Sequence, residues 1–194
     1  MFSLKLYLFD WYIMNIAIFG GSFDPPHTGH EEIVKEILNS LHVDKLFIVP
    51  TYLNPFKKKF FAPSKLRLKW LKKLFSRKEI VILDYEAKQE RSVPTIETIE
   101  YLKSIYTLNK IYLIIGADNL VNIDKWHRYD ELSKLVEFIV ASRDNQNIPK
   151  DLIKLPINAN ISSSKLRSKM DTTFIPHIIK KEIIEFYNKG KNGK

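Results

Sequence analysis

Two histidines in the segment Gly20–His30, which reads Gly-Gly-Ser-Phe-Asp-Pro-Pro-His-Thr-Gly-His, could hold one anionic group between them. The apolar run 16–19 before this segment is typical of a buried strand, and apolar residues within 33–38 recur with helical spacing. The order strand, glycine turn, helix places backbone N–H groups and the positive end of a helix dipole at the carboxyl edge of a sheet, where phosphates bind. His27 and His30 would face the same way at the first turn of that helix. The segment therefore predicts a phosphate-binding site.

Other common motifs do not fit this segment. It contains neither G-x-G-x-x-G nor glycines followed by Lys-Ser/Thr, which excludes the dinucleotide fingerprint and the P-loop. A zinc site is disfavoured because two histidines supply only half of a tetrahedral shell and no nearby carboxylate–histidine pair completes it. The chain has no cysteine, so disulfides and thiolate metal sites are excluded. We predict no metal bound by protein ligands and a reducing, cytoplasmic location.

Apolar runs along the rest of the chain predict the fold. The expected buried strands are 16–19, 45–49, 80–83, 111–115 and 138–141, and the expected helices include 63–75 and 95–106. Fully apolar strands separated by helices imply a parallel sheet covered on both faces. We predict an α/β fold, namely a Rossmann-like doubly wound parallel sheet with helices on both faces. The part from residue 151 onward is predicted to be helical and to fold onto the sheet.

The length of 194 residues fits one domain with a substantial core. Met14 directly begins the first strand, so residues 1–13 are predicted to be a dispensable N-terminal extension or the result of a mis-set start. This extension carries charges, is too short to span a bilayer and lacks a small-residue cleavage site. We predict a single domain over 14–188, a flexible tail over 189–194, and no membrane association.

The net charge of +9 is concentrated between Leu53 and Lys78, where ten basic residues occur without an acidic one. Nucleic acid could bind such a stretch, and so could a small polyanion such as ATP, which a positive field captures faster. For Lys69, Lys72 and Lys73 an ordinary solvated helix face is the simplest interpretation. Because no RNA-binding signature with interleaved aromatic residues occurs, we predict that the chain does not bind nucleic acid.

Four later segments, taken with the glycine turn, indicate a family. They are Pro50–Lys57, Ser92–Ile99, Ile114–Leu120 running on to Trp126-His127, and Ile161–Arg167. In this order they resemble the bacterial nicotinate-nucleotide adenylyltransferases of the H-x-G-H nucleotidyltransferase superfamily, over residues 14 to about 188. The resemblance implies transfer of AMP from ATP to nicotinate mononucleotide, giving nicotinate adenine dinucleotide and pyrophosphate in NAD biosynthesis. It also implies that Mg²⁺ binds together with ATP. It does not decide whether the protein is a monomer or a homo-oligomer.

The resemblance assigns roles to individual residues. It implies catalytic roles for His27, His30, Lys57 and Arg167, ATP binding by Gly20, Gly21, Ser22, Phe23, His30, Asp118, Ile161, Ser162, Ser163 and Arg167, and nicotinate nucleotide binding by Thr95, Trp126 and His127. The residue types suit these roles. The serines are N-cap types whose helix start offers N–H groups to phosphate, and Arg167 offers a bidentate fork. Trp126 can stack on a pyridinium ring. The resemblance implies that Thr95 and the backbone N–H of His127 hold the carboxylate of this ring, which a helix start near Thr95 would favour.

Three residues depart from the family pattern. Phe56 replaces a histidine, Pro94 a tyrosine and Glu97 an aspartate. The first change puts one phosphate or base contact in question. The other two lie near the acceptor, where they affect affinity or specificity rather than the reaction class.

Alternative functions stay open. The acceptor could be nicotinamide mononucleotide or phosphopantetheine, although Gly116-Ala117-Asp118 with Trp126 argues against phosphopantetheine. A class I aminoacyl-tRNA synthetase also has paired histidines after its first strand, but it needs an anticodon-binding domain, for which 194 residues leave no room. A non-catalytic nucleotide sensor is disfavoured by the presence of both histidines and Arg167, and a basic nucleic-acid binder would show a salt-dependent gel shift.

Overall fold

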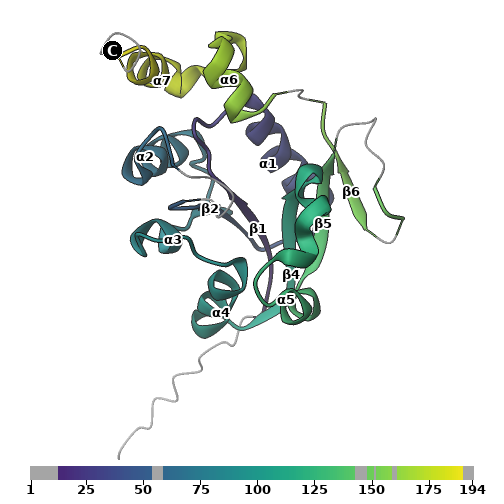
Figure 1. Ribbon diagram of the computed structural model, residues 1–194. Helices are drawn as coiled ribbons and strands as arrows, with labels where there is room; N and C mark the ends of the chain where they lie inside the picture. The colour runs from purple at the N-terminus through teal and green to yellow at the C-terminus, as the bar shows by residue number, and fades with distance from the viewer. Residues whose placement is uncertain (1–12, 54–58, 143–147, 151, 159–160, 190–194) are drawn as a thin grey trace, which may run out of the picture.

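The computed structural model describes residues 13–53, 59–142, 148–150, 152–158 and 161–189. Its centre is a sheet of six parallel strands in the spatial order β3-β2-β1-β4-β5-β6 (Figure 1). The strands are β1 (Met14–Gly21), β2 (Lys45–Pro50), β3 (Ile80–Ile82), β4 (Leu108–Gly116), β5 (Glu137–Ser142) and β6 (Ile153–Pro156). The predicted fold class is confirmed.

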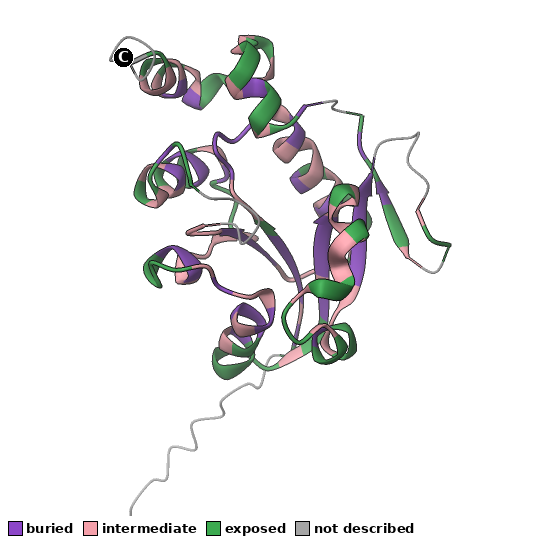
Figure 2. Cartoon of the chain, viewed as in Figure 1, coloured by how far each residue is buried: buried purple, intermediate pink, exposed green. Residues whose placement is uncertain are grey.

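Helices cover both faces of the sheet because its central strands are apolar on both sides. The helices are α1 (Thr28–Ser40), α2 (Ser64–Leu74), α3 (Tyr85–Lys88), α4 (Thr95–Ile105), α5 (Tyr129–Leu135), α6 (Ser163–Lys169) and α7 (His177–Lys189), with short 3-10 segments η1 (Ala117–Lys125) and η2 (Thr172–Phe174). On β1, Ile16 and Ile18 pack with residues of α4 and α5. Ala17 and Phe19 pack with residues of α1 and α2 on the opposite face. Most residues of β1, β2 and β5 are accordingly buried, whereas the outer helix faces are exposed (Figure 2).

The winding of the chain reverses between β1 and β4. β1 pairs with β2 on one side and with β4 on the other, and all three strands run in parallel. Their carboxyl ends therefore lie at one edge of the sheet, with Gly21 ending β1 and Gly116 ending β4. In open parallel sheets the crevice at such a reversal is where ligands bind.

The part of the chain after residue 151 is helical from Ser163 onward, as predicted, but it begins with a strand and packs differently. Ile153–Pro156 is not helical but forms β6, an edge strand parallel to β5. Only Leu155 is buried within it, so the strand is too short and too exposed to give a recognisable pattern. The helices that follow pack on α2 rather than on the sheet, through a cluster that includes Trp70, Leu166 and Ile179. α6 and α7 consequently lie beyond the carboxyl edge of the sheet (Figure 1).

None of the helices in the described part of the chain is long and apolar enough to cross a membrane.

Residues 1–12 lie outside the described residues, and their dispensability stays a prediction. The described structure begins with Ile13, which is exposed, and β1 starts at Met14, whose N–H donates to the carbonyl of Thr107 (3.0 Å). A protein that starts at Met14 is therefore expected to keep the Tm and the turnover of the full chain. Thermal unfolding and activity measured side by side test this. A clear loss of either would mean that the extension packs into the fold.

Candidate active site

The glycine turn after β1 brings an aromatic anchor beneath the first turn of α1. Phe23 is buried (1 % exposed) and adopts a left-handed backbone conformation (φ 47°) that turns the chain sharply. Its ring packs edge-on against Phe19 (5.4 Å between centroids) and at a tilt against the ring of His30 (4.8 Å). A Cβ on Gly21 would lie 3.2 Å from the Phe23 ring, so the absence of a side chain at Gly21 leaves room for this ring. The turn thus fixes both the backbone N–H groups and one histidine.

The two histidines of this turn form a stacked pair. Their ring centroids are 3.7 Å apart, and His27, the N-cap of α1, donates its backbone N–H to Nδ1 of His30 (3.1 Å). Because Nδ1 of His30 accepts this bond, the ring proton of the neutral imidazole sits on Nε2. Burial, and to a smaller extent the charge of His27, lowers the pKa of His30 well below its ordinary value. At neutral pH, His30 is therefore a neutral ring whose Nε2–H can donate to a phosphate oxygen.

A second helix start packs directly against this turn. A Cβ on Gly29 would lie 3.1 Å from the side chain of Ile161, so glycine allows the two segments to approach closely. Ser163, the first residue of α6, donates its hydroxyl to the carbonyl of Pro25 (2.9 Å). Ser162 caps α6 by accepting from the N–H of Lys165 (3.2 Å). The start of α6 and the start of α1 therefore flank the same glycine turn.

Arg167 joins these two segments. Its Nη1 donates to the backbone carbonyl of Asp24, and its Nη2 donates to the hydroxyl of Ser164 (3.1 Å). Its guanidinium carbon lies 4.3 Å from the centroid of the Phe61 ring. The structure thus brings the following predicted phosphate-binding residues together: Gly21, Ser22, Phe23, His27, His30, Ile161, Ser162, Ser163 and Arg167. Gly20 is exposed near the end of β1, and Lys57, like Phe56, lies outside the described residues.

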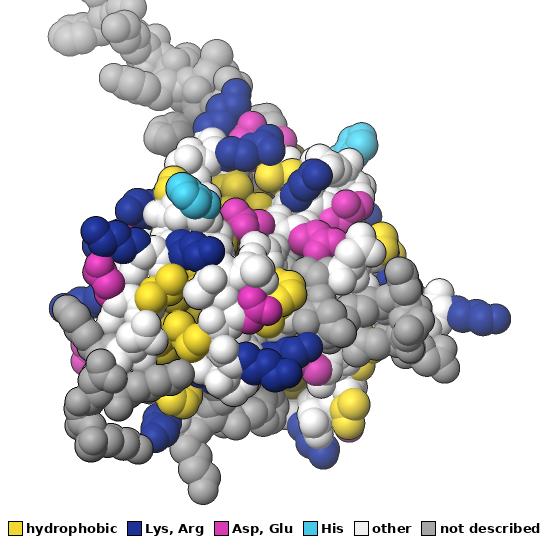
Figure 3. Space-filling view, turned by 90° about the horizontal axis from the view of Figure 1, so that it is seen from above, with side chains coloured by type: hydrophobic (Ala, Val, Ile, Leu, Met, Phe, Trp, Pro, Cys, Tyr) yellow, Lys and Arg dark blue, Asp and Glu magenta, His cyan; other side chains and the backbone are white. Residues whose placement is uncertain are grey.

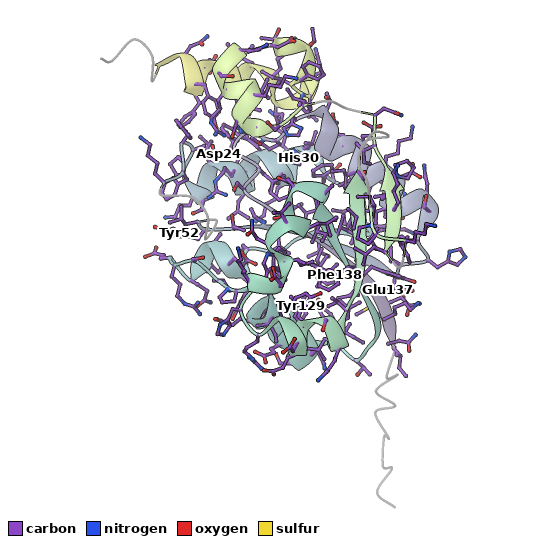
Figure 4. All side chains as sticks on the ribbon, turned by 45° about the vertical axis from the view of Figure 1, so that its right-hand side comes forward. Asp24, His30, Tyr52, Tyr129, Glu137 and Phe138 are labelled. Carbon is purple, nitrogen blue, oxygen red and sulfur yellow. The ribbon has the colours of Figure 1, made fainter. Side chains whose placement is uncertain are left out.

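Side-chain sticks show the same arrangement in space. Asp24 and His30 lie on the side of the molecule that faces α6 and α7, whereas Glu137 and Phe138 lie away from these helices (Figure 4). The turn is therefore at the edge where the C-terminal helices meet the sheet.

The residues predicted for the acceptor lie on α4 and on the turn before α5. Thr95 is the half-buried first residue of α4. Trp126, also half-buried, packs against the core cluster shared by α4 and the sheet, and His127 follows it on the surface. Arg128 then pairs with Glu100 of α4 (2.8 Å) and Glu131 of α5 (2.6 Å). This pairing holds the turn at 126–128 against the helix that Thr95 begins.

Asp118 lies between the two groups of residues. It is exposed at the start of η1, directly after β4, the strand next to β1. A Cβ on Gly116 would lie 2.5 Å from Oδ1 of Asp118, so the carboxylate folds over the end of the strand. This places an acceptor for hydroxyl groups at the carboxyl edge of the sheet, where β4 lies next to β1.

Sequence reasoning missed two buried charged residues beside the turn. The sequence assigns Asp24 no role within the glycine turn, and it places Arg67 among the basic residues of the 53–78 stretch. The structure buries both (3 % and 1 % exposed). A signal existed for Arg67, because it shares helical spacing with the buried Trp70 and Leu71 on α2.

Another buried carboxyl, Glu86 of α3, lies against the second turn of α4. Glu86 is 5 % exposed, and its Oε1 accepts from the hydroxyl of Thr98 (2.8 Å). Its Oε2 has no hydrogen-bond partner among the described residues. Burial raises the pKa of Glu86 from 4.5 to about 7. The protonated form is therefore favoured by folding.

The raised pKa of Glu86 predicts that stability falls with pH. The stability that protonated Glu86 contributes is complete below pH 4.5, which is the pKa of Glu86 in the unfolded chain. This stability is lost as the pH rises through about 7. Glu86→Gln cannot ionise and is expected to raise the free energy of unfolding at pH 8 by up to about 3 kcal/mol, since one pKa unit is about 1.4 kcal/mol. At pH 5 we expect little change. Denaturant unfolding at both pH values measures this, with Glu97→Gln as control, because Arg91 lowers the pKa of Glu97. Equal gains at both pH values would contradict the prediction.

In the part of the chain that the structure describes, no three His, Cys, Asp or Glu side chains lie close enough to hold a metal ion.

Comparisons with known proteins agree with this geometry. The pattern that defines the cytidylyltransferase-like family matches residues 18–169. A "Probable nicotinate-nucleotide adenylyltransferase" from Campylobacter fetus subsp. fetus is 50 % identical over 182 residues, covering 93 % of this chain and 100 % of the relative. A relative of the same name from Sulfurimonas denitrificans is 50 % identical over 173 residues, covering 89 % and 94 %.

A solved structure shares the fold. It is the Plasmodium falciparum nicotinic acid mononucleotide adenylyltransferase complexed with NaAD, with a TM-score of 0.72 and 23 % identity over 90 % of this chain and 96 % of that one. By its motifs, its fold and its curated relatives, the chain belongs to the cytidylyltransferase-like family, within the group of the nicotinate-nucleotide adenylyltransferases.

Proposed function

We propose that this protein transfers AMP from ATP to nicotinate mononucleotide, forming nicotinate adenine dinucleotide and pyrophosphate. The observation that carries the proposal is the packing of the α6 start and Arg167 against the glycine turn, which carries the stacked histidines. This arrangement offers two helix starts, a neutral imidazole N–H and a guanidinium to one polyphosphate. The names of the relatives at 50 % identity support the same reaction.

The chemistry needs positioning more than acid–base catalysis. The 5′-phosphate of the acceptor is already ionised at neutral pH, so no general base has to generate the nucleophile. It attacks the α-phosphorus of ATP in line, and pyrophosphate leaves. Donors that are fixed before the reaction stabilise the charge on the equatorial and leaving oxygens. We assign this task to His27 and His30, together with the backbone N–H groups of the glycine turn.

The leaving pyrophosphate is assigned to the other side of the turn. Arg167, the serines at the start of α6, and Lys57 would neutralise the charge that develops on it. Asp118 is assigned to the sugar hydroxyls of ATP. Mg²⁺ would be bound by the phosphates of ATP and would keep several of its waters, rather than sit in a cage of protein ligands. We therefore count it as part of the ATP substrate.

The acceptor is assigned to Thr95, Trp126 and His127. Trp126 would stack on the pyridinium ring, and the Thr95 hydroxyl with the N–H of His127 would bind its carboxylate. The start of α4 adds a favourable dipole for this negative charge.

We further propose a cytoplasmic enzyme that does not bind nucleic acid. Lys69 and Lys73 of the basic stretch both pair with Glu182 of α7 (3.0 and 2.9 Å). On the face seen in Figure 3, Lys and Arg side chains are interspersed with Asp and Glu. This mixture is unlike the one-sided basic stripe typical of nucleic-acid binding.

A pyrophosphate-release assay tests the reaction. The purified protein is given MgATP with nicotinate mononucleotide, nicotinamide mononucleotide or phosphopantetheine. We expect release with the first acceptor. Release only with phosphopantetheine would replace the proposed acceptor, and no release with any of the three would reject adenylyl transfer to this class of substrate.

A further inference from the structure

The buried carboxylate of Asp24, in the glycine turn, accepts hydrogen bonds at both of its oxygens. Its Oδ2 accepts from the N–H of Phe61 (2.8 Å), and its Oδ1 accepts from the N–H of Ala62 (2.9 Å) and from the hydroxyl of Tyr187. The residue is only 3 % exposed. Asp24 therefore ties the turn to the segment before α2 and to the C-terminal helix α7.

The buried guanidinium of Arg67 reaches four backbone carbonyls. Nη1 donates to Ser22 (2.7 Å) and Thr51 (2.7 Å), Nη2 donates to Tyr52 (2.9 Å), and Nε donates to Ala62 (2.9 Å). These carbonyls belong to the glycine turn, to the chain leaving β2 and to the chain entering α2. Only the planar fork of arginine can serve four acceptors in fixed directions.

The charge of Arg67 is balanced locally. Burial lowers the pKa of the Arg67 guanidinium from its ordinary value, and the nearby Asp24 and Tyr187 oppose this effect. An arginine so surrounded stays protonated at neutral pH. Burying two opposite charges is costly unless their hydrogen bonds are satisfied, and apolar residues could fill the same space. Here the hydrogen bonds of both groups are satisfied, so the two charges fix the relative positions of the segments that they join, which apolar side chains would not do.

Both charged residues act on one peptide segment. The N–H of Ala62 bonds to Asp24 and its carbonyl bonds to Arg67, so this residue is held on both sides. The preceding Phe61, whose N–H also bonds to Asp24, presents its ring to the guanidinium of Arg167. Arg167 in turn donates to the carbonyl of Asp24. Two of the contacts that place Arg167 thus depend on this network.

We propose that Asp24 and Arg67 are positioning residues that hold Arg167 in place for the polyphosphate. The inference rests on the proposed function, in which Arg167 contacts the leaving pyrophosphate. A misplacement of about 1 Å can lower a rate by about 100-fold, so rigid support of one guanidinium matters to turnover.

A double-mutant cycle between Arg67 and Arg167 tests the proposal. Arg67→Lys keeps the charge, but its single nitrogen cannot serve four carbonyls. In the parent background we expect it to lower kcat/KM for ATP by about fivefold or more, with KM for nicotinate mononucleotide nearly unchanged. In the Arg167→Ala background the same change is expected to cost less than about twofold, because the side chain being positioned is gone. Arg77→Lys, an exposed arginine paired with Glu79, serves as the matched control.

The outcomes separate positioning from plain stabilisation. An equal loss in both backgrounds, or no loss in the parent, would overturn the proposal. If Arg67→Lys does not fold, Tyr187→Phe enters the same cycle, since it removes only the hydroxyl bonded to Asp24. If the parent shows no turnover, the proposed function fails on its own. The cycle is then run on pyrophosphate binding by calorimetry, where coupling would support the placement of Arg167 and additivity would reject it.

Discussion

Replacing His30 by alanine is expected to lower turnover by about 100-fold or more, which is the scale of losing one donor to the transition state. The stacked pair and the bond from the His27 N–H leave Nε2–H of His30 as the donor. Alanine removes this donor, and with it the acceptor of the His27 N–H and the ring that packs on Phe23. Steady-state turnover with saturating ATP and acceptor measures the effect.

The control for this change is another histidine of the chain. His42 is exposed in the loop after α1, and His42→Ala is expected to leave turnover unchanged. Thermal unfolding of both variants shows whether the fold survives, and we expect a shift of only a few degrees for His30→Ala. Turnover within a few-fold of the parent, in a protein of normal Tm, would refute the role of His30.

The second expected result concerns the choice of acceptor. Nicotinate mononucleotide should be preferred over nicotinamide mononucleotide by at least about tenfold in kcat/KM. A hydroxyl, a backbone N–H and a helix start all donate to a carboxylate, whereas a carboxamide turns its own NH₂ donors towards at least one of them. An unpaired buried donor costs roughly 1–3 kcal/mol, and about 1.4 kcal/mol is a factor of ten.

Thr95 provides the test of this preference. Thr95→Ala is expected to weaken the binding of nicotinate mononucleotide and so to reduce the preference for it over nicotinamide mononucleotide. The KM for ATP should change little. Thr95→Ser keeps the hydroxyl and should retain the preference. Equal efficiency of the parent with both acceptors would reject the carboxylate pocket and leave the adenylyl transfer standing.

Much of the fold and the glycine turn could be predicted because their signals are local. β1, β2, β4 and β5 are short apolar runs, and the turn at Gly21 is marked by the residue types that a phosphate-binding strand–turn–helix needs. The packing of α6 against this turn follows from no local pattern. It could be expected only through the family resemblance.

The misinterpretation of Arg67 has a physical reason. A charged residue in a basic stretch is usually solvated, and the partners that make its burial favourable are backbone carbonyls, which carry no sequence signature. One of these carbonyls, that of Ser22, is 45 residues away along the chain. The edge strand β6 escaped prediction for a different reason, because a strand with one buried residue has no periodicity to detect.

The parallel pairing of β1 with β4 has a consequence for synthesis of the protein. Ile16 pairs with Ile111, and Asp24 receives the hydroxyl bond of Tyr187 from 163 residues further along. Chains emerge from the ribosome with the N-terminus first, so β1 must wait for nearly a hundred further residues before it gains its second neighbour. The buried carboxylate of Asp24 can receive the hydrogen bond of Tyr187 only after almost the whole chain has been made. A polypeptide released early could therefore build much of the sheet and still lack the bond that ties the turn to the C-terminal helix.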